Sequence, residues 1–350
     1  MPTEAIYANT PSCGLVAKTG VDSVHQFMLE LQNSGSPRAE RFLAEDLPRI
    51  RKKTAGFIDA QQSELALIPN FSFGLNALIP VLFPYKKVLL LDSDYPSLTQ
   101  PFVLNDFEIT WIASDDGFSF DLETIENAIQ QQGIRIVAVS QVQYLNGYCL
   151  DIEALGTICR SHGAILLVDG TQSLGAIPFS FEQSEVDVFI SSNYKWMNAG
   201  FGTGIMMMKT DFLNEHEPKI GGFPSFLNKS GTWEYAASIQ SYEPGHLNMG
   251  GFLVMEEAID FKLKLGLDNI YTHNKALLDL LVAGLESNGI AIRGPYSNEN
   301  RSSILCLGET PELTKALNAC KIVFKARSGS IRLGLHFHNT SEDVEMIMHT

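Results

Sequence analysis

Asp169 and Lys195 are two residues whose types and positions could do chemistry together on one ligand. The apolar run 164–168 is followed by Asp169, and the run 186–190, apolar except for Asp187, is followed five residues later by Lys195. Short runs that are apolar on both faces are typical of buried central strands. Because open α/β sheets bind ligands at the carboxyl ends of their strands, we expect the acid and the lysine to face one crevice.

Pyridoxal phosphate is a ligand that uses both of these groups. A lysine amine forms a Schiff base with its aldehyde, and an acid pairs with its ring nitrogen so that the ring can accept electrons. Ser192 and Tyr194 flank the lysine and could hold the phosphate oxygens. A strand-end aspartate alone is as often a magnesium ligand or a helix cap, and a lone lysine is usually solvated. The joint spacing favours the cofactor.

Three motifs around these residues resemble class V of the fold-type I pyridoxal-phosphate enzymes. D-G-T-Q-S begins at Asp169, S-x-Y-K-W contains Lys195, and G-x-G-T-G begins at Gly200. This family includes small-molecule aminotransferases, cysteine desulfurases, kynureninases and proteins similar to isopenicillin N epimerase. The resemblance implies an α/β fold, with a large domain built on a mostly parallel sheet flanked by helices and a smaller α+β C-terminal domain.

The order of the expected elements divides the chain in the same way. Strands alternate with helices as far as Lys209, whereas the later strands and helices have no βαβ rhythm, which indicates a separate α+β domain. We predict an N-terminal arm over residues 1–20, a large cofactor-binding domain over 21–240 and a small domain over 241–350. A chain of 350 residues is long enough for this division.

The resemblance implies further cofactor contacts in the first half of the chain. Asn70, Ser72 and Asn76 match the N-x-T-x-x-x-N pattern of the family's phosphate cradle, so Phe71 and Ser72 are predicted phosphate contacts. A small hydroxyl residue at a helix start suits an anion, because the backbone N–H groups there are free. Tyr95 stands where similar enzymes stack an aromatic residue on the cofactor ring.

The resemblance also places site residues later in the chain. Gln172 of the D-G-T-Q-S motif is a predicted cofactor contact. His246 stands in place of a family threonine that reaches a cofactor phosphate across the dimer interface, so we predict the same contact and a homodimer. Arg332 matches the arginine of R-x-G-x-x-R-x-S-x-H-x-Y-N-T, which binds the substrate carboxylate through two donors.

The charge and the composition of the chain indicate small molecules as its partners. The formal net charge is −15 and the basic residues are scattered, which argues against a nucleic-acid groove. No apolar run approaches the length of a membrane span, and no histidine or cysteine spacing suggests a metal site. The five cysteines are widely spaced and no signal peptide is visible, so we expect reduced thiols and a cytoplasmic protein.

The motifs leave several reactions open. Cysteine desulfurases need a nucleophilic cysteine shortly after the R-x-G element, but Arg327-x-Gly329 continues directly to Arg332 without one, which disfavours this activity. A kynureninase-like hydrolase and an epimerase similar to isopenicillin N epimerase both carry segments close to Y-K-W-M-N-A-G-F-G. A catalytically silent binding module is a further alternative, although it would not need Asp169, Lys195 and Arg332 together. We predict a transaminase that acts on an amino acid.

Overall fold

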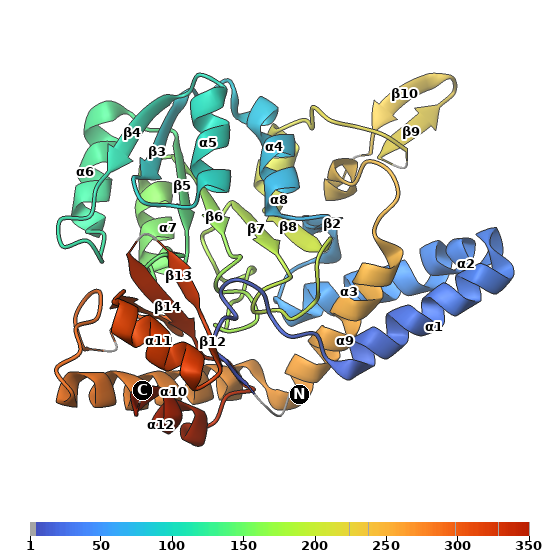
Figure 1. The fold of residues 1–350 in the computed structure, drawn as a ribbon. Helices are drawn as coiled ribbons and strands as arrows, with labels where there is room; N and C mark the ends of the chain where they lie inside the picture. The colour runs from blue at the N-terminus through green and yellow to red at the C-terminus, as the bar shows by residue number, and fades with distance from the viewer. Residues whose placement is uncertain (1–4, 224, 237, 298, 328, 350) are drawn as a thin grey trace.

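A seven-stranded sheet forms the centre of the protein (Figure 1). The structure is a computed structural model that describes residues 5–349 except 224, 237, 298 and 328. Residues 1–4 of the predicted arm and Ser328 of the C-terminal motif therefore lie outside the described residues. Within the described ranges, no helix is both long enough and apolar enough to cross a membrane.

The sheet has the strand order β2-β8-β7-β6-β5-β3-β4. Six strands run in the same direction, and β8 is antiparallel to both of its neighbours. The strands are β2 Leu65–Ile68, β3 Lys87–Leu91, β4 Glu108–Ile112, β5 Ile136–Ser140, β6 Ile165–Asp169, β7 Val188–Ser192 and β8 Gly204–Met208.

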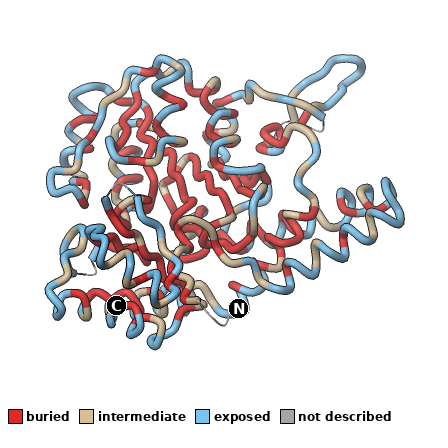
Figure 2. Tube along the Cα trace, viewed as in Figure 1, coloured by how far each residue is buried: buried red, intermediate tan, exposed pale blue. Residues whose placement is uncertain are grey.

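Alternate residues of the central strands enter two different cores. Leu167 and Val188 face one cluster, whereas Val168 and Phe189 face the other. The first face is covered by α4 Phe71–Leu82, α5 Pro96–Leu104 and α8 Thr210–Glu215. The second is covered by α1 Lys18–Ser34, α3 Leu47–Phe57, α6 Leu122–Gln132, α7 Ile152–Ser161 and α9 Met249–Leu265. The strands are buried on both sides (Figure 2), as their continuous apolar runs predict.

The C-terminal part has its own antiparallel sheet, of order β11-β14-β13, and its own apolar core. Its elements are α10 Leu267–Ser287, β11 Ile304–Gly308, α11 Pro311–Ala319, β12 Ile322–Val323, β13 Lys325–Arg327, β14 Ser330–Gly334 and α12 Ser341–Met348. The predicted fold class, a mostly parallel sheet flanked by helices plus a smaller α+β part, is confirmed. The predicted boundary near residue 240 assigns α9 to the small domain, yet α9 packs on α1 and α3 within the core of the large sheet.

Several shorter elements lie between these helices and strands. Helix α2 Ser36–Arg41 and a π-helical turn, Phe42–Asp46, precede α3, and 3₁₀ turns lie at Gln62–Glu64 and Ile239–Tyr242. A hairpin of β9 Phe226–Lys229 and β10 Thr232–Tyr235 projects from the segment between α8 and α9 (Figure 1).

The N-terminal arm joins the two parts of the molecule. Its strand β1 Ile6–Tyr7 pairs in parallel with β12, and the Ala8 carbonyl accepts a hydrogen bond from Gly334. Farther along, the Gly14 backbone N–H donates to the Tyr194 carbonyl at 2.8 Å. A Cβ atom at position 14 would lie 2.0 Å from the Lys195 carbonyl oxygen, so only glycine allows this approach. The arm therefore lies directly against the segment that carries the lysine.

A buried ion pair covers the edge of the large sheet at β2. Arg51 of α3 and Glu243 are both buried, and their closest atoms, Nη1 and Oε1, are 2.6 Å apart. Arg51 also donates to the Leu65 carbonyl, and Glu243 accepts from the Leu67 backbone N–H. These contacts satisfy backbone groups that an edge strand would otherwise expose.

We expect the substitution Glu243→Gln to lower the free energy of unfolding by about 3–5 kcal/mol, because it leaves the buried Arg51 charge without a counter-charge. Urea denaturation monitored by circular dichroism measures this loss. The exposed pair Lys229–Glu234 supplies the control, since Glu234→Gln should change the same quantity by less than about 1 kcal/mol. Equal effects of the two substitutions would contradict this role of the buried pair.

Candidate active site

A cavity of about 360 Å³ lies at the carboxyl ends of β6 and β7. All predicted site residues except His246 and Arg332 line it. The lining consists of Asn70, Phe71, Ser72, Tyr95, Ser97, Ser140, Tyr144, Asp169, Thr171, Gln172, Ser192, Tyr194, Lys195, Phe201 and Gly202. The topology thus brings together residues from five separate stretches of the sequence, as expected at the carboxyl ends of parallel strands.

Asp169 is the last residue of β6 and is 5% exposed. Its Oδ1 accepts a hydrogen bond from the Thr171 backbone N–H at 2.8 Å, and the Thr171 hydroxyl accepts one from the Ser192 backbone N–H. Burial raises the pKa of the Asp169 carboxyl, while Thr171 and the charge of Lys195 oppose this shift. The carboxylate can therefore stabilise a protonated ring nitrogen in a site with little water.

Lys195 lies in a tight turn after β7 and is 6% exposed. Its Nζ is 5.5 Å from the centre of the Tyr95 ring and 5.7 Å from that of Tyr194. Burial lowers the pKa of the Lys195 amine, the Asp169 charge opposes this, and Arg332 adds to it. A lowered pKa makes more of the neutral amine available as a nucleophile or base.

The amino end of α4 fits a phosphate group. The N-cap residue Asn70 accepts from the Phe73 backbone N–H, and the Phe71 backbone N–H donates to the Ser192 hydroxyl at 2.8 Å. A Cβ atom on Gly204 would lie 3.0 Å from the Asn70 Cα, so glycine lets β8 begin close to this helix end. The positive end of the helix dipole and the hydroxyls of Ser72 and Ser192 form a cradle that matches the phosphate of the expected cofactor.

Asp94 is a buried acid that the sequence analysis missed. It accepts hydrogen bonds from the Ser140 backbone N–H and hydroxyl, from the Tyr95 backbone N–H, and from the Gln143 side chain. Burial raises the pKa of its carboxyl. These bonds fix the start of α5, where the Tyr95 ring meets the Tyr144 ring edge-on at 5.1 Å. The signal in the sequence was the strand-end run D-S-D-Y, in which the acid directly precedes the aromatic residue.

Gln172 of the D-G-T-Q-S motif also holds the N-terminal arm in place. The Gln172 amide donates to the Pro11 carbonyl of the arm and accepts from the Trp196 indole N–H at 2.8 Å. Gln172 therefore ties the arm to the residue after the lysine, in addition to lining the cavity. Its predicted contact with the cofactor stays a prediction.

Arg332 of β14 lies beside this cavity. Its guanidinium donates to the Tyr144 carbonyl at 2.6 Å and to the Ser12 hydroxyl at 2.9 Å, while its buried Nε has no hydrogen-bond partner among the described residues. Tyr144 lines the cavity itself, so the arginine reaches the rim from the C-terminal sheet. His246 is exposed and lies outside the cavity of its own chain. Its predicted contact is with a partner subunit, and it stays a prediction.

No cysteine occurs among the described residues that line the cavity. Cys306 lies opposite Arg332 in the C-terminal sheet, where its thiol donates to the Leu145 carbonyl. Cys13 is half-buried in the arm next to Ser12, and burial raises the pKa of its thiol. Over the described residues, no group of three or more histidine, cysteine, aspartate or glutamate side chains could hold a metal ion.

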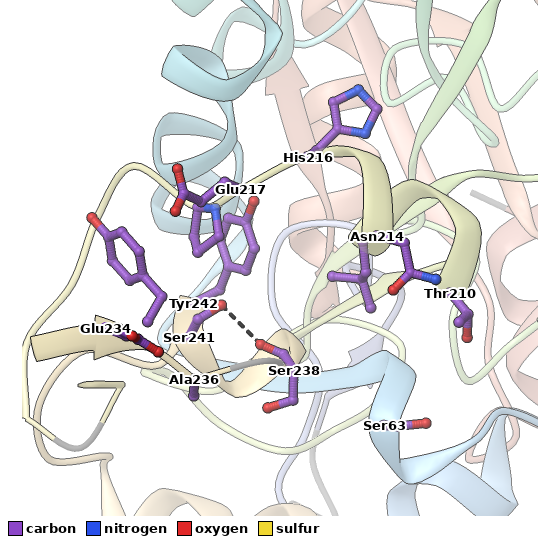
Figure 3. Close-up of a pocket in the computed structure, with 13 residues that line it drawn as sticks. Ser63, Thr210, Asn214, His216, Glu217, Glu234, Ala236, Ser238, Ser241 and Tyr242 are labelled. Carbon is purple, nitrogen blue, oxygen red and sulfur yellow. Dashed lines mark hydrogen bonds between the residues drawn. The ribbon is translucent and has the colours of Figure 1, made fainter. Parts of the chain in front are cut away.

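A second cavity, of about 490 Å³, lies at the other end of β8, near α8 and β10 (Figure 3). Its lining includes His216, Glu217, Glu234 and Tyr242. None of the predicted site residues lines this cavity, so the cavity around Lys195 is the candidate active site.

Comparisons with known proteins identify the family of this chain. The sequence matches the Aminotransferase class-V family over residues 21–347. A probable cysteine desulfurase of Pyrococcus abyssi is 23% identical, over 99% of this chain and 93% of the relative. The cysteine desulfurase of Thermococcus onnurineus NA1 has the same fold, with a TM-score of 0.90 and 22% identity over 99% of this chain and 93% of that one. The cystine C–S lyase C-DES, solved with its product cysteine persulfide, has a TM-score of 0.91 and 18% identity, covering 99% and 97% of the two chains.

These relatives correct the predicted reaction. The transaminase prediction, with its hydrolase and epimerase alternatives, is wrong, and so is the argument that disfavoured a cysteine desulfurase. That argument rested on a single loop position, whereas the likeness to the desulfurases extends over nearly the whole chain. The predicted family and cofactor are confirmed. The chain belongs to the class-V aminotransferase family of fold-type I enzymes, which use pyridoxal phosphate.

Proposed function

We propose that the protein is a pyridoxal-phosphate-dependent C–S lyase of the cysteine desulfurase type, which acts on cysteine or a related sulfur-containing amino acid. The observation that carries this proposal is the buried pair of Lys195 and Asp169 in one cavity, with Arg332 at its rim. The names of the relatives support the choice of a C–S bond over amino-group transfer.

One group of residues that line the cavity binds the cofactor in this proposal. When bound, pyridoxal phosphate supplies an aldehyde that captures amines and a ring that accepts electrons. Phe71, Ser72 and Ser192 hold the phosphate at the amino end of α4. Asp169 would keep a positive charge on the ring nitrogen, and the Tyr95 ring would stack on the cofactor and exclude water from it.

Lys195 and Arg332 act on the substrate. The guanidinium of Arg332 binds the α-carboxylate through two donors, in place of its present bonds to Ser12 and Tyr144. This fixes the orientation of the Cα–H bond relative to the lysine. The Lys195 amine, neutral in a larger fraction than an exposed lysine, takes the proton from Cα and can return it to the product.

The expected homodimer belongs to the same proposal. His246 follows the run Glu243-Pro244-Gly245 and is exposed on its own subunit. In a dimer it would be available to the phosphate end of the other subunit's cavity, where an imidazole can donate a hydrogen bond. Sedimentation of the cofactor-loaded protein is the relevant measurement, and a fully active monomer would contradict this part of the proposal.

The reaction itself can be tested by product analysis with L-cysteine and L-cystine, with and without a keto acid. We expect L-cysteine to give sulfide with pyruvate and ammonia, and L-cystine to give cysteine persulfide with pyruvate and ammonia. With an added thiol as sulfur acceptor, L-cysteine can instead give alanine and the persulfide of that thiol. None of these products should depend on the keto acid. The Lys195→Ala variant should bind the cofactor without turnover, because it lacks the base at Cα. Transfer of the amino group to a keto acid, with no release of sulfur, would contradict a C–S lyase.

The effect of the Asp169 charge on the Lys195 amine predicts how the rate of cofactor capture depends on pH. In the cofactor-free protein, the rate of pyridoxal phosphate capture should rise with pH with a midpoint below about 10.4, the value of an ordinary lysine. The Asp169→Asn substitution removes a negative charge that favours the ammonium form, so the midpoint should move to lower pH. Stopped-flow absorbance at a series of pH values measures it.

The exposed Asp211 on α8 offers a matched control, since Asp211→Asn should leave the midpoint unchanged. An upward shift in Asp169→Asn, or a midpoint at the ordinary lysine value in the unaltered protein, would show that the two side chains are not coupled in this way.

A further inference from the structure

The turn that carries Lys195 depends on Asn198. The Asn198 backbone N–H donates to the Lys195 carbonyl at 3.0 Å and closes the turn. Asn198 has a φ angle of 61°, in the left-handed region that side chains other than glycine rarely adopt, although asparagine tolerates it better than most. A conformation of this kind persists when surrounding contacts hold it in place.

The Asn198 side chain, only 5% exposed, supplies those contacts. Its Nδ2 donates to the Leu15 carbonyl of the arm at 3.0 Å. Its Oδ1 accepts from Lys262 Nζ of α9 at 3.1 Å and lies 3.2 Å from His336 Nε2. The arm, α9 and the segment after β14 therefore meet at one amide group.

Lys262 is 1% exposed, a burial that lysine rarely reaches. Its Nζ donates to the carbonyl oxygens of Gly175 and Asn198, each at 3.1 Å, and lies 3.2 Å from His336 Nε2. None of these three partners is acidic, and burial lowers the pKa of the amine. The cost of burying this side chain is therefore offset by hydrogen bonds rather than by an ion pair.

His336 connects this group to the substrate arginine. It lies four residues after Arg332 and is fully buried. Its Nδ1 faces the Asn274 amide nitrogen at 3.2 Å, and its Nε2 faces the Trp196 carbonyl at 3.0 Å. A neutral ring that accepts at Nδ1 and donates at Nε2 satisfies both contacts, and the same Nε2–H is also directed at Asn198 Oδ1. Lys262 and His336 therefore share the Asn198 oxygen as acceptor, and the lysine does not donate to the ring. Burial lowers the pKa of this imidazole.

A cavity of about 230 Å³ gives access to this buried group. Apolar side chains form most of its wall, chiefly Leu15, Val16, Ala258, Phe261 and Phe337. Lys262 and Asn198 also line it, and the Lys262 amine lies 4.7 Å from the centre of the Phe337 ring. A small amine can therefore enter the cavity and reach the position that the lysine head group occupies.

We propose that Lys262 is a positioning residue for the reaction. Through the Asn198 side-chain oxygen, which its amine shares with His336, it fixes the turn that carries Lys195 relative to the C-terminal strand that carries Arg332. The proposal rests on the proposed function in one respect, namely that Lys195 and Arg332 act on the same substrate.

The test is chemical rescue of Lys262→Ala by propylamine, which replaces the part of the side chain that the substitution removes. In the cofactor-loaded variant, we expect kcat for C–S cleavage to fall about tenfold or more with a smaller change in KM, because the lysine turn loses a buried donor. Millimolar propylamine should restore much of the loss. The exposed Lys264→Ala on the same helix is the control and should neither lose activity nor respond to propylamine.

Hydrogen exchange in the cofactor-free protein gives a reading that is independent of activity. The Asn198 and Ala199 backbone amides should exchange faster in Lys262→Ala than in Lys264→Ala, and propylamine should slow them again. This measurement tests the positioning role of Lys262 separately from the proposed C–S lyase activity, because its result does not depend on which reaction the protein catalyses.

Asn198→Gly keeps the test decisive if Lys262→Ala does not fold. Glycine adopts the left-handed backbone without strain, so this variant removes only the side-chain bonds, and its kcat should fall by a similar factor. Where both variants fold, combining them should cost little more than either alone. Full activity with unchanged exchange in either variant, or a loss in Lys262→Ala that propylamine does not reduce, would overturn the proposal.

Discussion

The burial of Lys195 and Asp169 in one cavity is the constraint on which the rest of the structure depends. Both side chains are almost fully removed from water, and each charge favours the ionised form of the other while burial disfavours it. Such a pair is costly unless its surroundings are fixed. The ends of β6 and β7 supply that rigidity, because adjacent strands of a sheet buried on both faces have little freedom to move.

The other elements of the site can be understood as supports of this pair. The arm approaches so closely at Gly14 that no side chain fits, and Gln172 ties the arm to Trp196. Asp94 fixes the start of α5, where Tyr95 lies close to the lysine. Arg332 comes from the C-terminal sheet, so the geometry of the site depends on the contact between the two parts of the molecule. The buried group around Lys262 lies at that contact.

The sequence predicted the central strands and the cavity well because their signals are local. Short apolar runs that end in polar residues specify buried parallel strands, and eight predicted side chains meet where those strands end. The run D-S-D-Y marks Asp94, but its bonds to Ser140 and Gln143 join distant parts of the sequence. The role of Lys262 could not be predicted, because its partners also lie far away in the chain. In the sequence, nothing distinguishes Lys262 from an exposed lysine of an amphipathic helix. The packing of α9 on the large sheet was missed for the same reason.

The reaction was the part that the sequence predicted wrongly. The absence of a cysteine between Arg327 and Arg332 disfavours a desulfurase, but a single loop position does not determine which bond of the substrate breaks, because the whole cavity does. The roles assigned to the other site residues depend on Lys195 as the residue that binds the cofactor. Borohydride reduction of the cofactor-loaded protein, followed by peptide mass spectrometry, tests this most directly. The account predicts a reduced pyridoxyl group on Lys195, whereas its appearance on another lysine, such as the buried Lys262, would contradict it.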